Sequence, residues 1–267
     1  MTTGKRLEDK VAIVTGAGTR GPMPGTGQAT AILFARHGAR VLLVDLEIQR
    51  AEETLVAIEH EGGQASVFRA DVTDEDDCRA MIEACLERYG ALHILFNNVG
   101  LGVGGMVTEI EEALWNRAID VNLKSMILTC KHAVPEIAAS GGGSIINVSS
   151  IDGLRAGFMP NVPYAVAKAG VAQLTRTMAV HHGRDNIRVN CIAPGHLHAP
   201  FVAHIPAEMR ELRRKAGPLG TEGNAWDVAW AAVFLASDEA RWISGVVLPI
   251  DAGLLAATPL AVLDNLR

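Results

Sequence analysis

The sequence predicts an α/β protein made of one doubly wound domain, with a seven-stranded parallel sheet and helices on both faces. Short runs rich in β-branched residues alternate along the chain with longer stretches of helical period, which is the pattern of successive βαβ units. The short runs are apolar almost throughout, as expected of strands that are covered on both faces. At 267 residues, 49% of them hydrophobic, the chain fits a single domain spanning 1–267, with a C-terminal tail at about 256–267.

We expect strands at the apolar runs and helices between them. The seven expected strands are residues 11–15, 40–45, 65–70, 94–98, 144–149, 187–193 and 245–251. The expected helices are residues 26–37, 47–61, 74–89, 111–138, 162–182 and 223–236. The fourth is expected to kink or end near Pro135, because proline lacks the amide hydrogen. Right-handed crossovers then leave the single-domain Rossmann fold as the simplest arrangement.

Composition and charge exclude several classes of partner. The net charge is −6 and no run is basic, so we expect neither a nucleic acid nor an anionic membrane partner. The first ten residues are polar and charged, unlike a signal peptide, and no apolar stretch reaches the roughly 18 residues of a membrane span. The predicted location is therefore cytoplasmic. Cys78, Cys85, Cys130 and Cys191 have no C-x-x-C spacing and are predicted to be reduced, buried thiols.

A glycine-rich segment joins the first expected strand to the first expected helix. Between Val14 and Ala31 it reads VTGAGTRGPMPGTGQATA, and its glycines are Gly16, Gly18, Gly21, Gly25 and Gly27. At such a junction the free backbone N–H groups and the helix dipole favour a pyrophosphate. The segment therefore predicts a dinucleotide site.

Asp45 indicates which dinucleotide binds there. It ends the second expected strand, 18 residues after Gly27, close to the spacing at which an acidic side chain meets the adenosine ribose. A carboxylate there accepts from the 2′-hydroxyl and repels a 2′-phosphate, so NAD is favoured over NADP. Two alternatives stay open: Asp45 could only cap the next helix, and Arg20 could neutralise a 2′-phosphate or simply be solvated.

Tyr164 and Lys168 form a candidate acid–base pair. They are four residues apart in an expected helix and so share one face, where an ammonium can stabilise a phenolate and lower the tyrosine pKa from about 10. Ser150 lies 14 residues earlier and follows the fifth expected strand, where its hydroxyl could polarise a carbonyl. A lone Y-x-x-x-K occurs often by chance on exposed helices, so its meaning depends on the motifs around it.

From Lys10 to Gly253 the chain resembles the single-domain short-chain dehydrogenases/reductases, and several motifs carry the resemblance in the expected order. They are the TGxxxGxG-like turn from Thr15 to Gly27, Asp71-Val72 as the adenine contact, Asn97-Asn98-Val99-Gly100 as the NNAG motif, the helix residue Asn122, the trio Ser150, Tyr164 and Lys168, and Pro194-Gly195 beside the nicotinamide.

The resemblance implies an oxidoreductase that interconverts a secondary alcohol and a ketone by hydride transfer. Tyr164 would be the general acid or base and Ser150 would hold the substrate oxygen, while Lys168 would lower the tyrosine pKa and bind the nicotinamide ribose. Asn122 would hold a water in the proton relay. The implied cofactor-binding residues are Gly16, Gly25, Thr26, Gly27, Asp45, Asp71, Val72, Asn98, Gly100, Tyr164, Lys168, Pro194 and Gly195.

The chain departs from the family pattern in three places. Eight residues separate Gly16 from Gly25 where the family has three, and we expect the insertion of five to bulge outward over the adenosine side. Val99 replaces the alanine of NNAG, which predicts only local repacking. Ala199 stands where a threonine commonly follows the Pro-Gly step. His196 or His198 could replace its contact, and although H-x-H permits a metal, two ligands are too few and no metal is predicted.

Three loops beyond the strand ends are expected to build the substrate pocket, at residues 100–105, 152–161 and 196–215. Their candidate apolar walls are Leu154, Phe158, Met159 and Phe201, and their candidate polar contacts are Asp152, Arg155, His196 and His198. Each of these side chains could equally be ordinary loop packing. The substrate is therefore predicted only as a small-molecule secondary alcohol or ketone of modest size.

The resemblance also implies a homotetramer, assembled through the helices of Asn122 and Tyr164 and through the last strand. The tail from residue 256 could reach a neighbouring subunit or fray. One alternative function is an NADP-dependent 3-oxoacyl thioester reductase, although the charge of −6 gives no support for binding an acidic carrier. Another is a dinucleotide-sensing regulator without catalysis, against which the intact trio argues.

Overall fold

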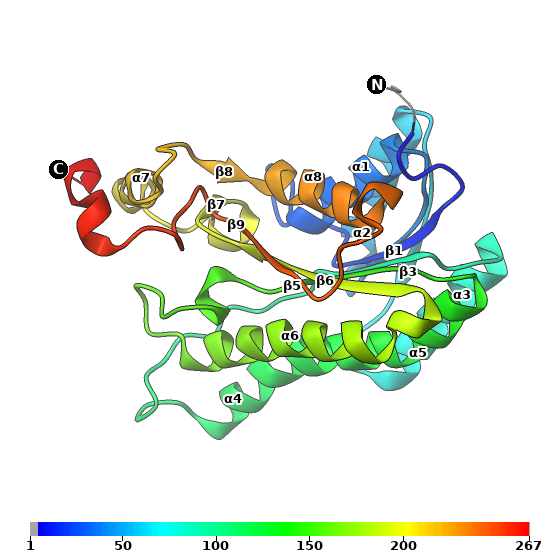
Figure 1. Ribbon diagram of the computed structural model, residues 1–267, viewed down its shortest axis with the longest axis horizontal. Helices are drawn as coiled ribbons and strands as arrows, with labels where there is room; N and C mark the ends of the chain where they lie inside the picture. Colours follow the sequence, from blue (N-terminus) through cyan, green and yellow to red (C-terminus); the bar gives the residue numbers. More distant parts are fainter. Residues whose placement is uncertain (1–4, 267) are drawn as a thin grey trace.

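Apolar runs in the sequence form the central sheet of the computed structural model, which describes residues 5–266 (Figure 1). Within these residues the sheet has seven strands, paired in parallel in the order β3-β2-β1-β4-β5-β6-β9. The strands are β1 (Val11–Thr15), β2 (Arg40–Asp45), β3 (Gln64–Arg69), β4 (Ile94–Asn97), β5 (Gly143–Val148), β6 (Ile187–Pro194) and β9 (Val247–Ile250). The predicted fold class is confirmed.

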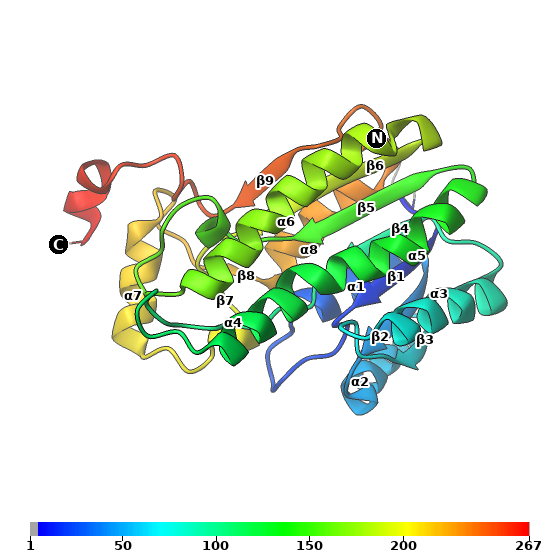
Figure 2. The same ribbon diagram turned by 90° about the horizontal axis from the view of Figure 1, so that it is seen from below.

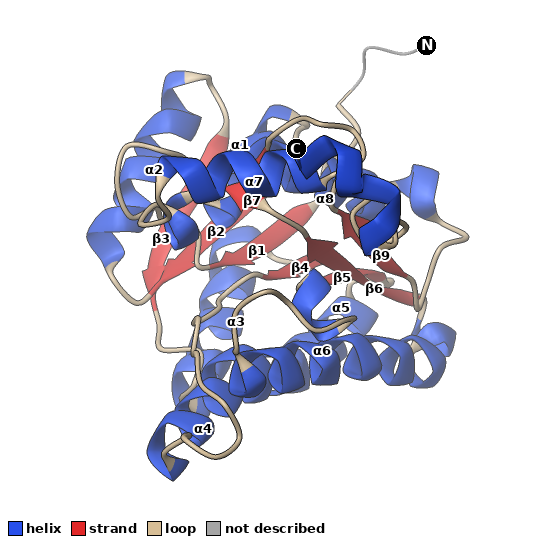
Figure 3. Ribbon diagram, turned by 90° about the vertical axis from the view of Figure 1, so that its left-hand side faces the viewer, coloured by secondary structure: helices blue, strands red, loops and turns tan. Residues whose placement is uncertain are grey.

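Helices cover both faces of this sheet (Figures 1 and 3). One face packs against α1 (Thr26–Arg36), α2 (Ile48–His60) and α8 (Ala225–Ala236). The other packs against α3 (Glu75–Tyr89), α5 (Ser125–Ala139) and α6 (Val162–His181). Because every strand side chain in β1 meets a helix on one face or the other, β1 is buried along its whole length, as its continuous apolar sequence predicts.

The helix expected at 111–138 is divided by a wider turn. It consists of α4 (Glu112–Ile119), the π-helical turn η1 (Asp120–Lys124) and α5. Pro135 does not end the helix, which continues to Ala139. Pro135 is on the exposed side of α5, where water can bind the carbonyl group that its missing N–H leaves free.

A second group of elements lies beyond the carboxyl ends of the strands, and the sequence did not predict it. It contains α7 (Ala207–Ala216), the short paired strands β7 (Leu197–His198) and β8 (Gly223–Asn224), and the 3₁₀ segments η4 (Pro200–Val202) and η6 (Pro259–Leu266). Figure 2 shows α7 and the C-terminal segment past the arrowheads of β5 and β9. The C-terminal tail packs η6 against α7, with Val262 buried, so this segment does not fray.

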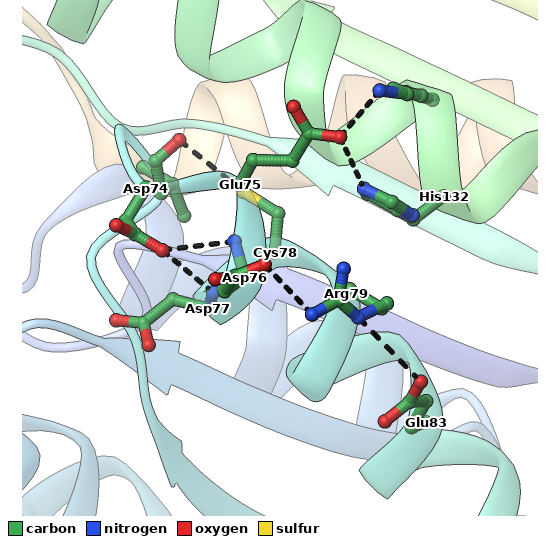
Figure 4. Close-up of polar contacts among 10 residues, drawn as sticks. Asp74, Glu75, Asp76, Asp77, Cys78, Arg79, Glu83 and His132 are labelled. Atoms are coloured by element: carbon green, nitrogen blue, oxygen red, sulfur yellow. Dashed lines mark hydrogen bonds and ion pairs between the residues drawn. The ribbon is translucent and has the colours of Figure 1, made fainter.

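Charged side chains fix the start of α3 and join it to α5. The carboxylate of Asp74 accepts hydrogen bonds from the backbone of Asp76 and Asp77 at 2.9 and 3.0 Å, which caps the helix (Figure 4). The next residue, Glu75, pairs with Lys131 and lies 3.5 Å from His132, both on α5. The acidic residues at the start of α3 therefore have structural roles: they cap α3 and join it to α5.

Two general expectations can be compared with the described residues. Within them the four cysteines are all free and buried, as predicted. None of the helices in residues 5–266 is both long enough and apolar enough to span a bilayer.

Candidate active site

The order of the strands creates a crevice at one edge of the sheet. Strand β1 lies between β2 and β4, so the chain leaves the middle of the sheet in opposite directions on the two sides. Ligands of doubly wound folds bind in the crevice that this reversal opens at the carboxyl ends of the strands. Gly16 follows β1 and Asn98 follows β4, so both predicted cofactor residues lie at the crevice.

Gly16 and Gly27 make the tight turn that the sequence predicted. Gly16 has a φ of +62°, which favours glycine, and a Cβ atom on Gly27 would lie 2.0 Å from the carbonyl oxygen of Gly16. Asn98 holds the turn from the side. Its Nδ2 donates to Gly16 O at 3.1 Å, and its Oδ1 accepts from the hydroxyl of Thr26 at 2.5 Å.

The start of α1 suits an anion. Gly25 precedes the helix, and within residues 5–266 no side chain caps its first amides and its first turn carries no acidic residue. Backbone N–H groups at such a helix start need an acceptor, and the helix dipole favours one that is negatively charged. The residues present therefore fit the pyrophosphate of a dinucleotide.

The lengthened loop begins at residues that bond β2 and its end. Ala17 donates to the backbone of Val44 at 3.1 Å, and Gly18 donates to the Oδ2 atom of Asp45 at 3.0 Å. The tip of the loop, at Arg20, Gly21 and Pro22, is exposed. This outward path on the Asp45 side agrees with the expected bulge.

Asp45 is held rigidly at the end of β2. Besides the bond from Gly18, its Oδ1 accepts from the backbone of Glu47 at 3.1 Å, while α2 begins at Ile48 with Glu47 as its cap residue. Asp45 therefore stabilises the turn before α2 rather than capping the helix itself. Each carboxylate oxygen has a second lone pair, so the group can still accept from a ribose hydroxyl.

The predicted adenine contact, Asp71-Val72, follows β3 at the same edge of the sheet. The Oδ1 of Asp71 accepts from the backbone and the hydroxyl of Thr73 at 2.9 and 2.6 Å. Burial opposes ionisation, but these bonds together with the positive charges of Arg117 and Arg69 outweigh it and lower the pKa of Asp71. Val72 is buried. The Oδ1 atom of Asp71 thus fixes the turn at Thr73, and its Oδ2 atom takes no part in these two bonds.

Ser150 and Tyr164 come from different elements and meet at the crevice. Ser150 follows β5 and its Oγ accepts from the backbone of Asp152 at 3.1 Å, while Tyr164 lies in the first turn of α6. Burial raises the pKa of Tyr164 to about 12, opposed by a hydrogen bond with Ser150 and reinforced by the charge of Asp152. The chain alone therefore keeps the phenol protonated.

Lys168 lies one turn further along α6 and is almost completely buried. Its ammonium donates to Val148 O at 2.9 Å and lies 5.8 Å from the centroid of the Tyr164 ring. Burial lowers the pKa of Lys168 to about 8. In the chain alone, burial instead raises the tyrosine pKa, so the lowering expected from this lysine is not met there.

Asn122 lies within the π-helical turn, and its side chain is held on both sides. Its Oδ1 accepts from Leu101 N at 3.0 Å, and its Nδ2 donates to the carbonyl oxygens of Leu101 and Ala118 at 2.9 and 3.0 Å. A Cβ atom on Gly100 would lie 3.3 Å from Asn122 Oδ1 and 3.5 Å from Lys168 Nζ. Because Gly100 has no side chain, it leaves a space that is bordered by Asn122 and Lys168.

Pro194 ends β6, and Gly195 follows it at the same edge of the sheet. Gly195 donates to Ile250 O at 2.9 Å, and a Cβ there would lie 2.6 Å from the Cβ of Asp251. His196 and His198 follow, and both line a small pocket near α7. In residues 5–266 no group of three or more His, Cys, Asp or Glu side chains could hold a metal ion.

The candidate substrate loops differ in how close they come to the tyrosine. The ring of Phe201 lies 6.2 Å from the Tyr164 ring, and it would meet a Cβ on Gly102 at 3.1 Å. Phe158 and Met159 are largely exposed, at 80% and 65%, so the chain as it stands does not bury them in a pocket. Phe201 is thus a predicted apolar wall that lies beside the Tyr164 ring.

Several supporting side chains were missed by the sequence reasoning. Ser149 donates from its hydroxyl to Lys168 O at 2.6 Å, which joins β5 to α6. The buried amide of Asn97 bonds Asn147 at 2.9 Å and accepts from Thr129. The amide of Asn161 donates to Asp152 at 2.8 Å. These partners are 9 to 50 residues apart in the chain, at no fixed spacing, so one sequence carries no signal for their pairing.

A family model described as enoyl-(acyl carrier protein) reductase matches residues 21–255. The chain belongs to the short-chain dehydrogenase/reductase family. Cis-4-hydroxycyclohexanecarboxylate dehydrogenase of Sinomonas cyclohexanicum is 38% identical over 95% of this chain and 99% of its own length. The 3-oxoacyl-[acyl-carrier-protein] reductase of Thermotoga maritima is 36% identical over 94% and 99%.

A solved short-chain dehydrogenase/reductase from Burkholderia xenovorans has the same arrangement, with a TM-score of 0.91, 39% identity, and coverage of 95% of this chain and 99% of its own. The short-chain dehydrogenases/reductases use nicotinamide dinucleotides and act on CH–OH groups. This chain is accordingly an oxidoreductase of that kind.

Proposed function

We propose that the protein is an NAD-dependent oxidoreductase that interconverts a secondary alcohol and a ketone by hydride transfer, with Tyr164 as the acid or base. The observation that supports this most strongly is that Tyr164 bonds Ser150 and has the ammonium of Lys168 5.8 Å from its ring, in a fold whose glycine turn fits a dinucleotide.

Asp45 supports NAD over NADP. Its carboxylate is fixed at the end of β2 by two backbone N–H groups, at the position where an adenosine ribose is bound in this fold. A fixed negative charge accepts from a 2′-hydroxyl and repels a 2′-phosphate. When bound, the dinucleotide supplies or accepts the hydride.

The chain's own residues handle the substrate oxygen and its proton. Ser150 donates to the oxygen, and Tyr164 takes the hydroxyl proton in oxidation or returns it in reduction. Lys168 stabilises the phenolate electrostatically, and Asn122 holds the relay water. Because burial raises the pKa of Tyr164 to about 12, the phenol is ready to act as an acid at neutral pH, and oxidation is faster at alkaline pH.

We further propose a cyclic secondary alcohol of modest size as the substrate, acted on by a homotetramer. The Sinomonas cyclohexanicum relative, by its name, oxidises a ring alcohol, and it matches this chain over almost its whole length. Phe201 above the Tyr164 ring offers an apolar surface against which a small ring can pack.

A second candidate is an NADP-dependent 3-oxoacyl thioester reductase, which the name of the Thermotoga maritima relative favours. Asp45 disfavours the 2′-phosphate, and the net charge of −6 disfavours an acidic carrier. A dinucleotide-sensing regulator without catalysis is disfavoured by the complete set of Ser150, Tyr164, Lys168 and Asn122.

The test is a panel of cyclic and open-chain secondary alcohols and their ketones, assayed with NAD(H) and NADP(H) in parallel. The expected result is turnover of a ring alcohol with NAD, reduced about 10²- to 10⁴-fold in Tyr164→Phe. The sequence offers a matched control, since its one other tyrosine, Tyr89, bonds Ser66 away from the crevice. Tyr89→Phe is expected to keep full activity, whereas equal activity in Tyr164→Phe would show that the acid–base assignment is wrong.

A further inference from the structure

Asn161 directly precedes helix α6, but its side chain does not cap the helix. Asparagine is a favoured residue at a helix start, because its side-chain oxygen accepts from a free backbone N–H. Within residues 5–266 this side chain makes no such bond, and its Nδ2 atom instead donates to the Oδ2 atom of Asp152 at 2.8 Å. The Asn161 side chain therefore joins two segments of the site instead of stabilising its own helix.

Asp152 in turn holds the hydroxyl of Ser150 through its backbone. The N–H of Asp152 donates to Ser150 Oγ at 3.1 Å, and Tyr164 is hydrogen-bonded to the same hydroxyl. A serine hydroxyl has two lone pairs and one hydrogen, so the bond from Asp152 leaves the hydrogen free for Tyr164 or for a substrate oxygen. The place of Asp152 thus determines where the Ser150 hydroxyl points.

The turn that carries Asp152 lies directly against α6. It is the 3₁₀ turn η2 (Ile151–Gly153), and a Cβ atom on Gly153 would lie 2.6 Å from the backbone of Lys168. The loop that follows also passes close to the carboxylate, since a Cβ on Gly157 would lie 2.7 Å from the Oδ1 atom of Asp152. Such close packing transmits a shift of Asp152 to its neighbours.

Asn161 is also joined to the candidate substrate loop at residues 100–105. Asn161 and Gly105 form a parallel β-bridge. Gly105 N donates to Pro160 O at 2.9 Å, and Val162 N donates to Gly105 O at 3.3 Å. Two of the three candidate substrate loops therefore meet at Asn161, next to the helix turn that carries Tyr164.

Charged groups from several elements act on Tyr164 or on Asp152. From α6 the ammonium of Lys168 lies 5.8 Å from the centroid of the Tyr164 ring. From η2 the negative charge of Asp152 raises the pKa of the Tyr164 phenol, because it disfavours the phenolate. Arg213 of α7 and His196 beyond β6 interact electrostatically with Asp152. Asp152 thus opposes Lys168 at the phenol.

We propose that Asp152 and Asn161 are a pair of positioning residues for the Tyr164 reaction. Their hydrogen bond holds the Ser150 turn against the first turn of α6, and the Asp152 charge slows oxidation at low pH by opposing the phenolate. Both residues act through Ser150 and Tyr164 and not on the substrate itself. This inference rests on the proposed function, because it takes Ser150 and Tyr164 as the reacting pair.

The test is the pH profile of kcat/KM for oxidation of cyclohexanol with NAD. Asn161→Ala breaks the bond and keeps the charge, so kcat should fall about 10-fold through lost alignment, with the rising limb at the wild-type pH. Asp152→Asn removes the charge but keeps an oxygen that accepts from Asn161. Its kcat on the plateau should therefore stay within about 3-fold of wild type, and its rising limb should move about half a pH unit lower.

Three further variants are controls. Asp152→Ala removes the charge and the acceptor together and should show both effects. Asn161→Ser is too short to reach Asp152 but suits a helix start, so a loss of kcat equal to that of Asn161→Ala excludes a frayed helix as its cause. Asp185→Asn removes a carboxylate beyond the far end of α6 and should change neither quantity. Fluorescence titration should give a Kd for NADH within about 2-fold of wild type in every variant.

Wild-type kcat in both Asn161 variants would overturn the positioning role, and a rising limb at the wild-type pH in Asp152→Asn would overturn the role of the charge. If wild type oxidises cyclohexanol in a Tyr164-dependent way, these results refute the pair alone.

If no alcohol in the panel is oxidised, the proposed function fails, and ultraviolet titration of the NAD complex still tests the charge. The chain has two tyrosines, so in a Tyr89→Phe background the phenolate absorbance reports Tyr164. Its rise should begin at lower pH when Asp152→Asn is added, and an unchanged onset would contradict the proposal.

Discussion

At the scale of single residues, the closest backbone approach in the site is between Gly27 and Gly16. A Cβ atom on Gly27 would lie 2.0 Å from a carbonyl oxygen of the turn and 2.7 Å from the Nδ2 atom of Asn98. A side chain at this position must therefore push the helix start away from the turn, which would spoil both the packing and the anion site.

We predict that Gly27→Ala raises the Kd for NAD at least about 10-fold and lowers the free energy of unfolding by about 1–3 kcal/mol, the range for overpacking. Fluorescence titration and urea unfolding measure the two effects. Gly183→Ala is the control, because a Cβ there meets nothing within 4 Å. Unchanged NAD affinity in Gly27→Ala would contradict the position assigned to the turn.

The residues of the acid–base pair could be read from the sequence, but their protonation could not. Tyr164 and Lys168 are four apart, so any helix puts them on one face. Their pKa values depend on burial under loops that are distant in the chain, and burial moves the phenol to about 12 and the ammonium to about 8.

At the scale of elements, the lengthened loop after β1 can be shortened to the family spacing. Removing residues 20–24 leaves Ala17, Gly18 and Thr19 between Gly16 and Gly25, and it keeps the backbone bonds from Ala17 to β2 and from Gly18 to Asp45. The removed residues include the exposed tip. The deletion should therefore change the loop and spare the turn.

We predict that the protein lacking residues 20–24 binds NAD within about 3-fold of wild type and keeps its preference over NADP. Titrations with both cofactors measure this. Asp45→Ala in the full-length loop is the comparison, and there the preference for NAD should fall. A loss of NAD binding in the deletion would mean that the inserted residues themselves hold the dinucleotide.

Helices and strands whose apolar residues recur at a regular spacing could be predicted from the sequence, and elements without such a spacing could not. The apolar strands and the helices that cover them follow from period alone, as β1 and α6 illustrate. Helix α7 has the sequence AEMRELRRKA and, within the described chain, buries no residue fully, so apolar spacing could not reveal it. The π-helical turn around Asn122 was missed because an added residue in a turn leaves the local composition helical.

At the scale of the whole molecule, four buried thiols make the stability sensitive to alkali. Burial raises the pKa of Cys78, Cys85 and Cys130 from 9.0 to about 12, and that of Cys191 to about 11. Above pH 9 the unfolded chain loses these protons while the folded chain keeps them, so the free energy of unfolding falls as pH rises. Lys168 acts in the opposite direction between about pH 8 and 10.5, but it is one group against four.

We predict that the free energy of unfolding in urea is smaller at pH 10 than at pH 8. Each thiol contributes up to about 1.4 kcal/mol per pH unit. Cys130→Ala should lose less stability over the same interval, by about one such contribution, whatever its stability at pH 8. Equal stability of wild type at pH 8 and pH 10 would contradict the burial of the thiols.

The segment from Asn98 to Leu101 connects the two halves of the site. At one end Asn98 holds the glycine turn and Thr26, and at the other end the backbone of Leu101 holds the amide of Asn122. Three peptide bonds thus separate Asn98, which bonds the glycine turn, from Leu101, which bonds Asn122 of the proposed proton relay. Substitutions along this bridge should be epistatic with changes at both ends, and a mutational scan would see affinity and turnover vary together.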